Sequence, residues 1–302
     1  MELVWYALLG LFFATYLVLA GYDYGVGLML ATDGGEHSRR RALNAVGPFF
    51  LGNEVWLVAA VGILFGAFPM LEGELLSGLY PAVVTALTGV ILVTAGVQLR
   101  SRPTGAAGRS GWDRVVIGGS ALAALGWGAV LAGLLQGVPL RADGHVAGVG
   151  HLVTPFVAAS GLALVGLVAV HGAVFLALRL PGKAGERHRR LARRLVPVAL
   201  VAAGTAAVLG LLTDRVRETV QQPVAALALP VLLVAASTWP YALVSSVDPS
   251  ASLTVADAAA STPTLRLLSW LLIPLLPALL GFQVMSWWVF RGRIDGRAPV
   301  YW

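Results

Sequence analysis

The sequence predicts an all-α fold, that of a polytopic integral membrane protein, and three observations support this class. Of the 302 residues, 58% are hydrophobic and 12% are charged, whereas soluble domains carry roughly 25% charged residues. The mean hydropathy is +0.80. Apolar runs of roughly 20 residues, the length that crosses a bilayer as a helix, recur along the chain. The chain has no cysteine, which excludes disulfides and metal centres held by cysteine.

About eight such runs occur, and we expect them to form two packed four-helix groups, residues 1–137 and 149–294, followed by a short cytoplasmic tail at 295–302. The first run has no basic leader and is too long for a cleaved signal peptide, so we expect it to remain as the first helix. The predicted spans are residues 3–30, 46–70, 78–99, 115–136, 150–178, 195–213, 224–246 and 265–290.

The basic residues orient these spans. The net charge of +6 could suggest nucleic acid, but Lys and Arg gather in short loops between apolar runs, which is typical of membrane topology. Loops 33–45, 100–114 and 179–194 are therefore expected in the cytoplasm. The N-terminus and the loops after the second and fourth runs are expected outside.

The last third of the chain does not follow this rule. Segment 247–263 has acidic residues and no Lys or Arg, which favours an external position. Two spans after the cytoplasmic 179–194 loop would instead return it to the cytoplasm. Either a segment around 214–230 is irregular or the charge rule fails here.

Small and aromatic residues predict packing and anchoring. Gly21, Gly25 and Gly27 lie along the first run and predict a close approach of another helix. Trp287 and Trp288 lie near the end of the last run, where interfacial aromatic residues are common.

Glu54 is the most informative candidate, because it lies well inside the second run. A charge there costs about 2.5–3.5 kcal/mol on insertion scales. Gly52 and Asn53 offer close backbone approach and a hydrogen-bonding amide, and Trp56 offers an indole donor. We favour a role in proton transfer over a neutral, hydrogen-bonded core residue.

Asp23 lies late in the first run, and two interpretations of it stand equal. It is either an acid paired with a nearby arginine or part of a proton or ion path.

The remaining candidates have ordinary interpretations. His171 lies deep in a run and could be a haem ligand, but a hydrogen-bonded core histidine is favoured. No two histidines show ligand spacing on one helix, so we expect no metal site. Arg100 ends the third run as an anchor on the cytoplasmic side. Asp257 belongs to a Ser/Thr-rich stretch expected to cap the last helix. No nucleotide-binding or hydrolase motif is present.

Two stretches, GYDYGVGLML at 21–30 and GPFFLGNEVWLVAAVGILFGAFP at 47–69, resemble subunit II of the cytochrome bd quinol oxidases. That family reads approximately D-G-F-D-x-G-V-G-M-L in the first and W-D-G-N-E-V-W in the second. The resemblance continues through LLQGVPL at 134–140, HLVTPF to HGAVFLALR at 151–179, and SLTVADAAASTPTL to WWVFRGRI at 252–294.

The resemblance implies that this chain binds no haem itself. Haem b and haem d, with the quinol site, would belong to a partner subunit I. The pair would oxidise quinol and reduce oxygen to water. By position, Asp23 matches the second Asp of D-G-F-D, Glu54 and Trp56 match N-E-V-W, and Arg100 matches an arginine ending the third helix.

Several positions depart from the family pattern. Ala20 stands where D-G-F-D begins, and Phe50-Leu51 stands where the family has W-D. That Asp is implicated in the family's proton path through subunit II, and leucine cannot relay a proton. The family usually has nine helices, and the missing one would fall between the sixth and seventh runs.

The sequence thus predicts a haem-free oxidase subunit in a bacterial cell membrane, forming a heterodimer with subunit I. Small accessory subunits, membrane lipid and a quinone or lipid bound by this chain are further expectations, and nucleic acid is not. The alternatives are a stand-alone ion- or proton-coupled transporter, or a structural membrane subunit that has lost the oxidase role. The absence of half-to-half symmetry disfavours the transporter.

Overall fold

A computed structural model describes residues 1–102, 105–213 and 230–292, and helices dominate these residues. The elements are α1 (Glu2–Met29), α2 (Glu36–Ala67), α3 (Pro69–Gly78), α4 (Tyr80–Leu99), α5 (Ala106–Gln136), the 3₁₀ turn η1 (Gly150–Leu152), α6 (Pro155–Arg179), α7 (Gly182–Leu211), α9 (Pro230–Thr238), β1 (Tyr241–Leu243), η2 (Pro249–Ala251), β2 (Leu253–Thr254), α10 (Val255–Ala258) and α11 (Thr262–Val289).

Seven helices within the described residues are long and apolar enough to cross a membrane, namely α1, α2, α4, α5, α6, α7 and α11. They correspond to seven of the predicted runs, which confirms the fold class. Three begin well before the predicted span: α2 at Glu36, α5 at Ala106 and α7 at Gly182. The added turns carry arginines, because an apolar window detects only the part of a helix that lies in hydrocarbon.

The predicted run at 224–246 is corrected in part. Residues 224–229 lie outside the described residues, as does the interval 214–229 in which a ninth helix was considered. Within the described part, α9 ends at Thr238 and residues Tyr241–Leu243 form a strand. The physical reason is Pro240, because the proline ring disfavours helical backbone at the residue before it.

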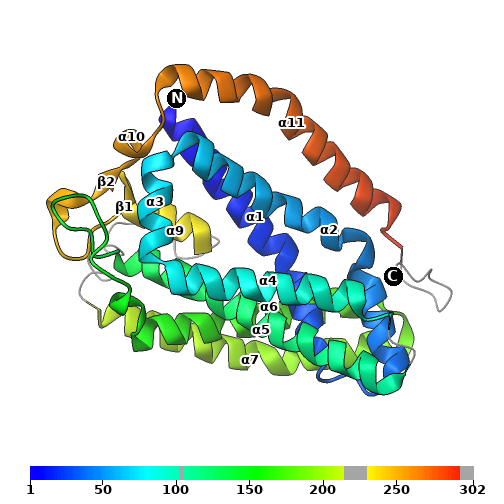
Figure 1. Cartoon of the computed structure of the whole chain (residues 1–302). Helices are drawn as coiled ribbons and strands as arrows, with labels where there is room; N and C mark the ends of the chain where they lie inside the picture. Colours follow the sequence, from blue (N-terminus) through cyan, green and yellow to red (C-terminus); the bar gives the residue numbers. More distant parts are fainter. Residues whose placement is uncertain (103–104, 214–229, 293–302) are drawn as a thin grey trace.

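The helices form a bundle around α1, which packs against α2, α5 and α6 (Figure 1). α4 lies along α5, and α6 lies along α7. α11 is set apart, touching the bundle mainly at α2, and none of its most apolar stretch is buried. The division into groups 1–137 and 149–294 stays a prediction, since α1 and α5 of the first both contact α6 of the second.

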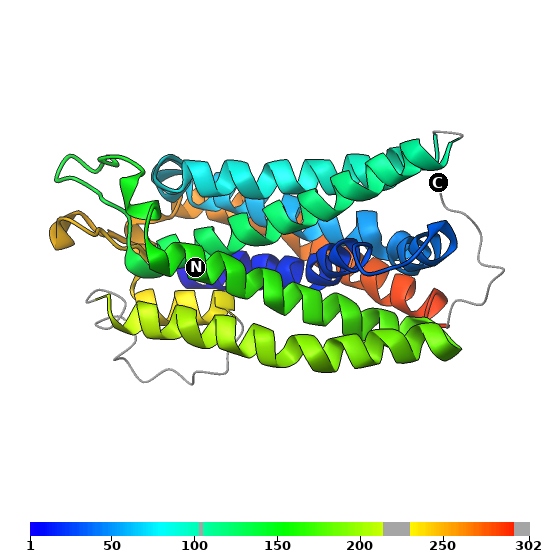
Figure 2. The same cartoon turned by 90° about the horizontal axis from the view of Figure 1, so that it is seen from below.

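Backbone contacts decide where the 239–261 segment lies. Val138 N–H donates to the Val244 carbonyl at 2.9 Å, and Ala260 N–H donates to the Ala67 carbonyl at 2.8 Å. The segment therefore lies at the end of the bundle where α2 and α5 finish (Figure 2). The helices α2, α5 and α7 begin at the other end, and their N-terminal turns carry arginines such as Arg39, Arg109 and Arg187, so we call it the basic end. The segment thus shares its end of the bundle with the loops after α2 and α5, for which the charge pattern also favours an external position.

The close approach predicted from the glycines occurs between α1 and α6. A Cβ atom built on Gly25 would lie 2.0 Å from the Val168 carbonyl oxygen, and one built on Gly172 would lie 2.1 Å from the backbone carbon of Gly25. No side chain fits between these backbones, so glycine at both positions sets the distance between the two helices.

We predict that Gly25→Ala destabilises the protein by about 1–3 kcal/mol, the usual cost of overpacking. Gly118→Ala, on α5, is the matched control, because a Cβ atom there would meet nothing within 4 Å. The midpoint of thermal unfolding in detergent is the measurement. Equal midpoints for the two variants would contradict the close contact.

Candidate functional site

Asp23 lies where α1 meets α2, and its side chain is buried, with 4% of the residue exposed. Its partner is Asn53 of α2, whose amide donates to Asp23 Oδ2 at 2.8 Å and to the Tyr22 hydroxyl at 2.6 Å. The Leu19 carbonyl, at 3.5 Å, is a weaker third acceptor. Asn53 therefore ties α1 to α2 by side-chain hydrogen bonds inside the membrane-spanning part of both helices.

This arrangement does not support the interpretation in which Asp23 pairs with a nearby arginine. Its recorded hydrogen-bond partner is a neutral amide, and no ion pair to Asp23 occurs among the described residues. The other carboxyl oxygen, Oδ1, is buried without a hydrogen-bond partner in that part of the chain. A carboxyl group held in this way can gain or lose a proton without breaking an ion pair.

Glu54 contacts a different helix. Thr94 of α4 donates to Glu54 Oε1 at 2.5 Å, and the Glu54 side chain is half-buried. The expectation that Asn53 and Trp56 serve Glu54 is wrong. Asn53 bonds Asp23, and the Trp56 indole donates to Gln283 of α11 at 3.1 Å. Successive residues of a helix point about 100° apart, so Asn53 and Glu54 face different neighbours.

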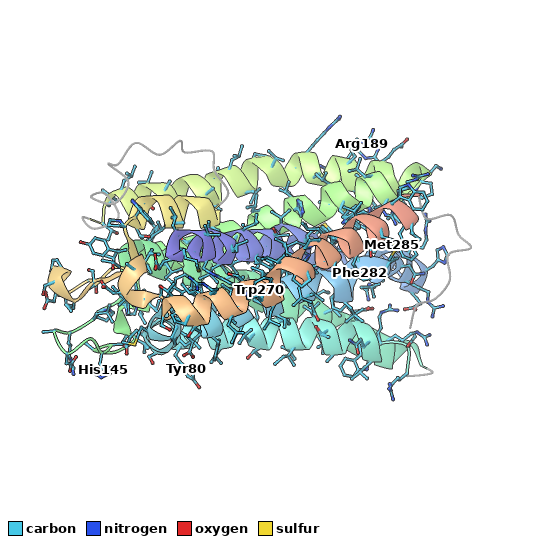
Figure 3. The ribbon with its side chains drawn as sticks, turned by 90° about the horizontal axis from the view of Figure 1, so that it is seen from above. Tyr80, His145, Arg189, Trp270, Phe282 and Met285 are labelled. Atoms are coloured by element: carbon cyan, nitrogen blue, oxygen red, sulfur yellow. The ribbon has the colours of Figure 1, made fainter. Side chains whose placement is uncertain are left out.

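Trp56 and Gly52 mark the contact of α2 with α11. Besides the bond from Trp56 to Gln283, a Cβ atom on Gly52 would lie 3.2 Å from the Phe282 ring. The side chains of Trp270, Phe282 and Met285 can be followed along α11 in Figure 3. Gly52 therefore allows the ring of Phe282 to approach α2.

A buried pair of tyrosines was missed by the sequence analysis. The hydroxyl groups of Tyr16 and Tyr24 are hydrogen-bonded to each other, and the Trp127 indole of α5 donates to Tyr16 at 3.1 Å. Tyr16 is fully buried and Tyr24 is 4% exposed. The two residues lie eight apart on α1, a spacing that an apolar pattern does not single out. The pair contacts α5 through Trp127, whereas Asp23 contacts α2 through Asn53.

Arg100 is more than an anchor. It follows α4, is 5% exposed, and donates to Asp113 Oδ1 at 2.5 Å and to Glu36 Oε2 at 2.8 Å. Asp113 also accepts from Arg39 at 3.0 Å. Burial by itself lowers the pKa of Arg100, but the bonds to Asp113 and Glu36 outweigh it, and the pKa is raised. These ion pairs join α2, α4 and α5 at the basic end.

His171 lies on α6 and is exposed on the surface of the bundle. Its Nε2 atom lies 3.2 Å from the Val18 carbonyl of α1. Among the described residues, no hydrogen bond joins His171 to Asp23 or Glu54. Within the described residues, no group of three His, Cys, Asp or Glu side chains is placed to hold a metal ion.

The family model described as "Cytochrome bd terminal oxidase subunit II" matches residues 1–290. The chain belongs to this family. It is a multi-pass membrane protein of the bacterial bd oxidase subunit II type, as the G-N-E-V-W motif predicted.

Named relatives cover nearly the whole chain. Cytochrome bd ubiquinol oxidase subunit 2 of Bacillus subtilis (strain 168) is 29% identical over 330 residues, which cover 98% of both chains. Cytochrome bd-I ubiquinol oxidase subunit 2 of Escherichia coli (strain K12) is 26% identical over 360 residues, covering 97% of this chain and 95% of the relative. The bd oxidase structure from Geobacillus thermodenitrificans matches with a TM-score of 0.69 at 19% identity, over 95% of this chain and 98% of that chain, which shows a shared fold.

Two positions distinguish this member from the family pattern. Leu51 is 51% exposed, so it points out of the helix bundle rather than toward Asp23. Ala20, on α1, is 2% exposed and belongs to the buried core. Glu54 lies three residues after Leu51 on α2, so the two positions are neighbours on that helix, whereas Asp23 lies on α1.

Asp257 lies in α10, shortly before α11. Thr254 caps that short helix by accepting from Asp257 N–H at 3.1 Å, and it donates to the Asp257 carboxylate at 2.5 Å. α11 begins later, with Ser261 as its N-cap residue and no side-chain cap bond. The stretch thus precedes the last helix as expected, but Asp257 stabilises α10 rather than α11.

We predict that Asp113→Asn destabilises the protein by about 3–5 kcal/mol, because it leaves Arg100 buried with fewer negative partners. Asp143→Asn, in the exposed loop after α5, is the control and is expected to change little. Protein yield in membranes and the midpoint of thermal unfolding are the measurements. An Asp113→Asn variant as stable as the control would show that the ion pairs contribute nothing.

Proposed function

We propose that the chain is the haem-free subunit of a bd-type quinol:oxygen oxidoreductase and that it supports a haem-bearing subunit I in a heterodimer. Family membership over residues 1–290 supports this proposal. The relatives from Bacillus subtilis and Escherichia coli are named as ubiquinol oxidase subunits. Haem b and haem d would belong to the partner, and quinol would be the substrate of the complex.

We further propose that Asp23 and Glu54 handle protons for this complex. The observation that carries this proposal is the bond between Asp23 and the neutral amide of Asn53, with Asp23 Oδ1 unpartnered in the described residues. A buried acid inside a membrane helix is costly and is usually functional when it has no cation beside it. Asn53 would position the carboxyl group, and Asp23 would exchange the proton.

Glu54 would act from the other side of α2. Thr94 of α4 donates a hydrogen bond to Glu54, and this bond links α2 to α4. Because position 51 is leucine and faces outward, the route of protons would differ from one through that position. We assign the exchange to Asp23 and Glu54 and propose no order between them.

A cavity of about 420 Å³ supports the expectation of a bound quinone or lipid. It lies between α1, α2 and α11, and its lining side chains are apolar, including Trp5, Phe12, Ile63 and Leu276. An isoprenoid or acyl chain fits this chemistry. Solvent extraction and mass spectrometry of the purified protein would detect such a ligand, and an extract free of both would count against it.

We predict that Asp23→Asn and Glu54→Gln each lower quinol-driven oxygen consumption by about tenfold or more, as expected for loss of a proton-transfer group. Haem content of the purified complex should stay near that of the wild type, because each amide is close in shape to the acid it replaces. Glu72→Gln, in α3, is the control. Oxygen consumption and haem content unchanged in both variants would sink the proposal of proton handling.

A further inference from the structure

Arginines at the basic end fall into two kinds. Several that lie on or next to α2, α4 and α5 have acidic partners within the chain: Arg39 and Arg100 pair with Asp113, and Arg109 pairs with Glu36. On α7, Arg187 pairs with Asp33. Four further arginines of α7 have no ion pair recorded in the part of the chain that the structure describes, and all four are exposed, namely Arg189, Arg190, Arg193 and Arg194.

These four residues lie on one side of α7. Residues three, four and seven apart share a helix face, so Arg189 and Arg193 form one row and Arg190 and Arg194 form the adjacent row. The opposite side of the helix, at Gly185, His188 and Ala192, is buried against the rest of the protein. Figure 3 shows Arg189 projecting away from the helix bundle.

Each row joins two positive charges one turn apart, and such like-charge pairs weaken an isolated helix. Between residues 182 and 194 the chain has six Lys and Arg but one acid, Glu186, for which no ion pair is recorded among the described residues. A bound anion would relieve this repulsion, because the described part of the chain records no ion pair for the four arginines. The surface is called the α7 arginine face below.

The same rows continue into exposed apolar residues. Arg189 and Arg193 are followed on their row by Val196, which is 40% exposed, and Leu200, which is 67% exposed. The adjacent row ends in Val201, 70% exposed. At 1.5 Å per residue, Leu200 lies roughly 10 Å below Arg193 along the helix. A molecule that covers these rows must carry negative charge at one end and hydrocarbon at the other.

We propose that the α7 arginine face binds an acidic phospholipid, with its phosphate groups on the four arginines and its acyl chains along Val196, Leu200 and Val201. Clusters of basic residues beside the apolar part of a membrane helix suit anionic headgroups, which guanidinium groups bind by paired hydrogen bonds. A water-soluble acidic protein would satisfy the charges but would leave the apolar continuation of both rows unexplained. Cardiolipin, with two phosphates, is the probe that this charge favours.

The test uses the protein purified from its host with the subunits that accompany it, reconstituted in nanodiscs of phosphatidylcholine with or without cardiolipin. Native mass spectrometry counts the cardiolipin retained, and thermal unfolding reports the stabilisation that it gives. The test variant replaces the four arginines with glutamine. A second variant replaces them with lysine, which keeps the charge needed for membrane topology. A matched control removes four exposed arginines elsewhere, by R102Q, R114Q, R141Q and R266Q.

We expect the wild type, the lysine variant and the matched control to retain cardiolipin. The glutamine variant should bind it at least tenfold more weakly, since each basic residue near a membrane surface contributes about fivefold. If that variant does not insert, R193Q/R194Q replaces it, with a smaller loss expected. Equal retention by the wild type and the glutamine variant overturns the proposal. An acidic protein that accompanies the wild type alone, with cardiolipin retention unchanged, overturns it as well.

Discussion

The bond between Asn53 and α1 is the interaction on which the candidate site depends. Within hydrocarbon there is no water to satisfy polar side chains, so each must find its partner in the protein. The Asn53 amide donates hydrogen bonds to both the Tyr22 hydroxyl and the Asp23 carboxyl group. These bonds fix how α1 and α2 face each other. Because the amide is neutral, it orients the Asp23 carboxyl group without pairing it with a cation.

Close packing supports this bond from the other side of α1. The backbones of Gly25 and Gly172 approach so closely that no Cβ atom fits, which holds α6 against the turn that follows Asp23. The Tyr22 ring then stacks on Phe175 of α6 with ring centroids 4.6 Å apart. Glycine contacts and aromatic stacking thus confine Tyr22 and Asp23 from two directions. The ion pair of Arg100 with Asp113 lies away from this site, at the basic end.

Much of this was predictable, because hydrophobic runs and charged loops are properties of single segments. The membrane class, seven of the spans and the close packing at Gly25 follow from such local patterns, while the roles of Asp23 and Glu54 stay proposals. The hydrogen-bond partners of these side chains were not predictable. Asn53 was expected to hydrogen-bond its neighbour Glu54, but its amide donates to Asp23 instead. Asp113 and the Tyr16–Tyr24 pair were missed, since their roles depend on contacts between distant segments. The departure at 239–246 came from treating an apolar run that contains Pro240 as one helix.

The measurement that tests the account most directly is a reduced-minus-oxidised visible spectrum of the complex purified through a tag on this chain. The account predicts haem b and haem d bands together with a second helical membrane subunit, because the chain is taken to support a haem-bearing partner. A colourless preparation that is stable as a single chain would contradict the oxidase role and would favour a stand-alone membrane protein instead.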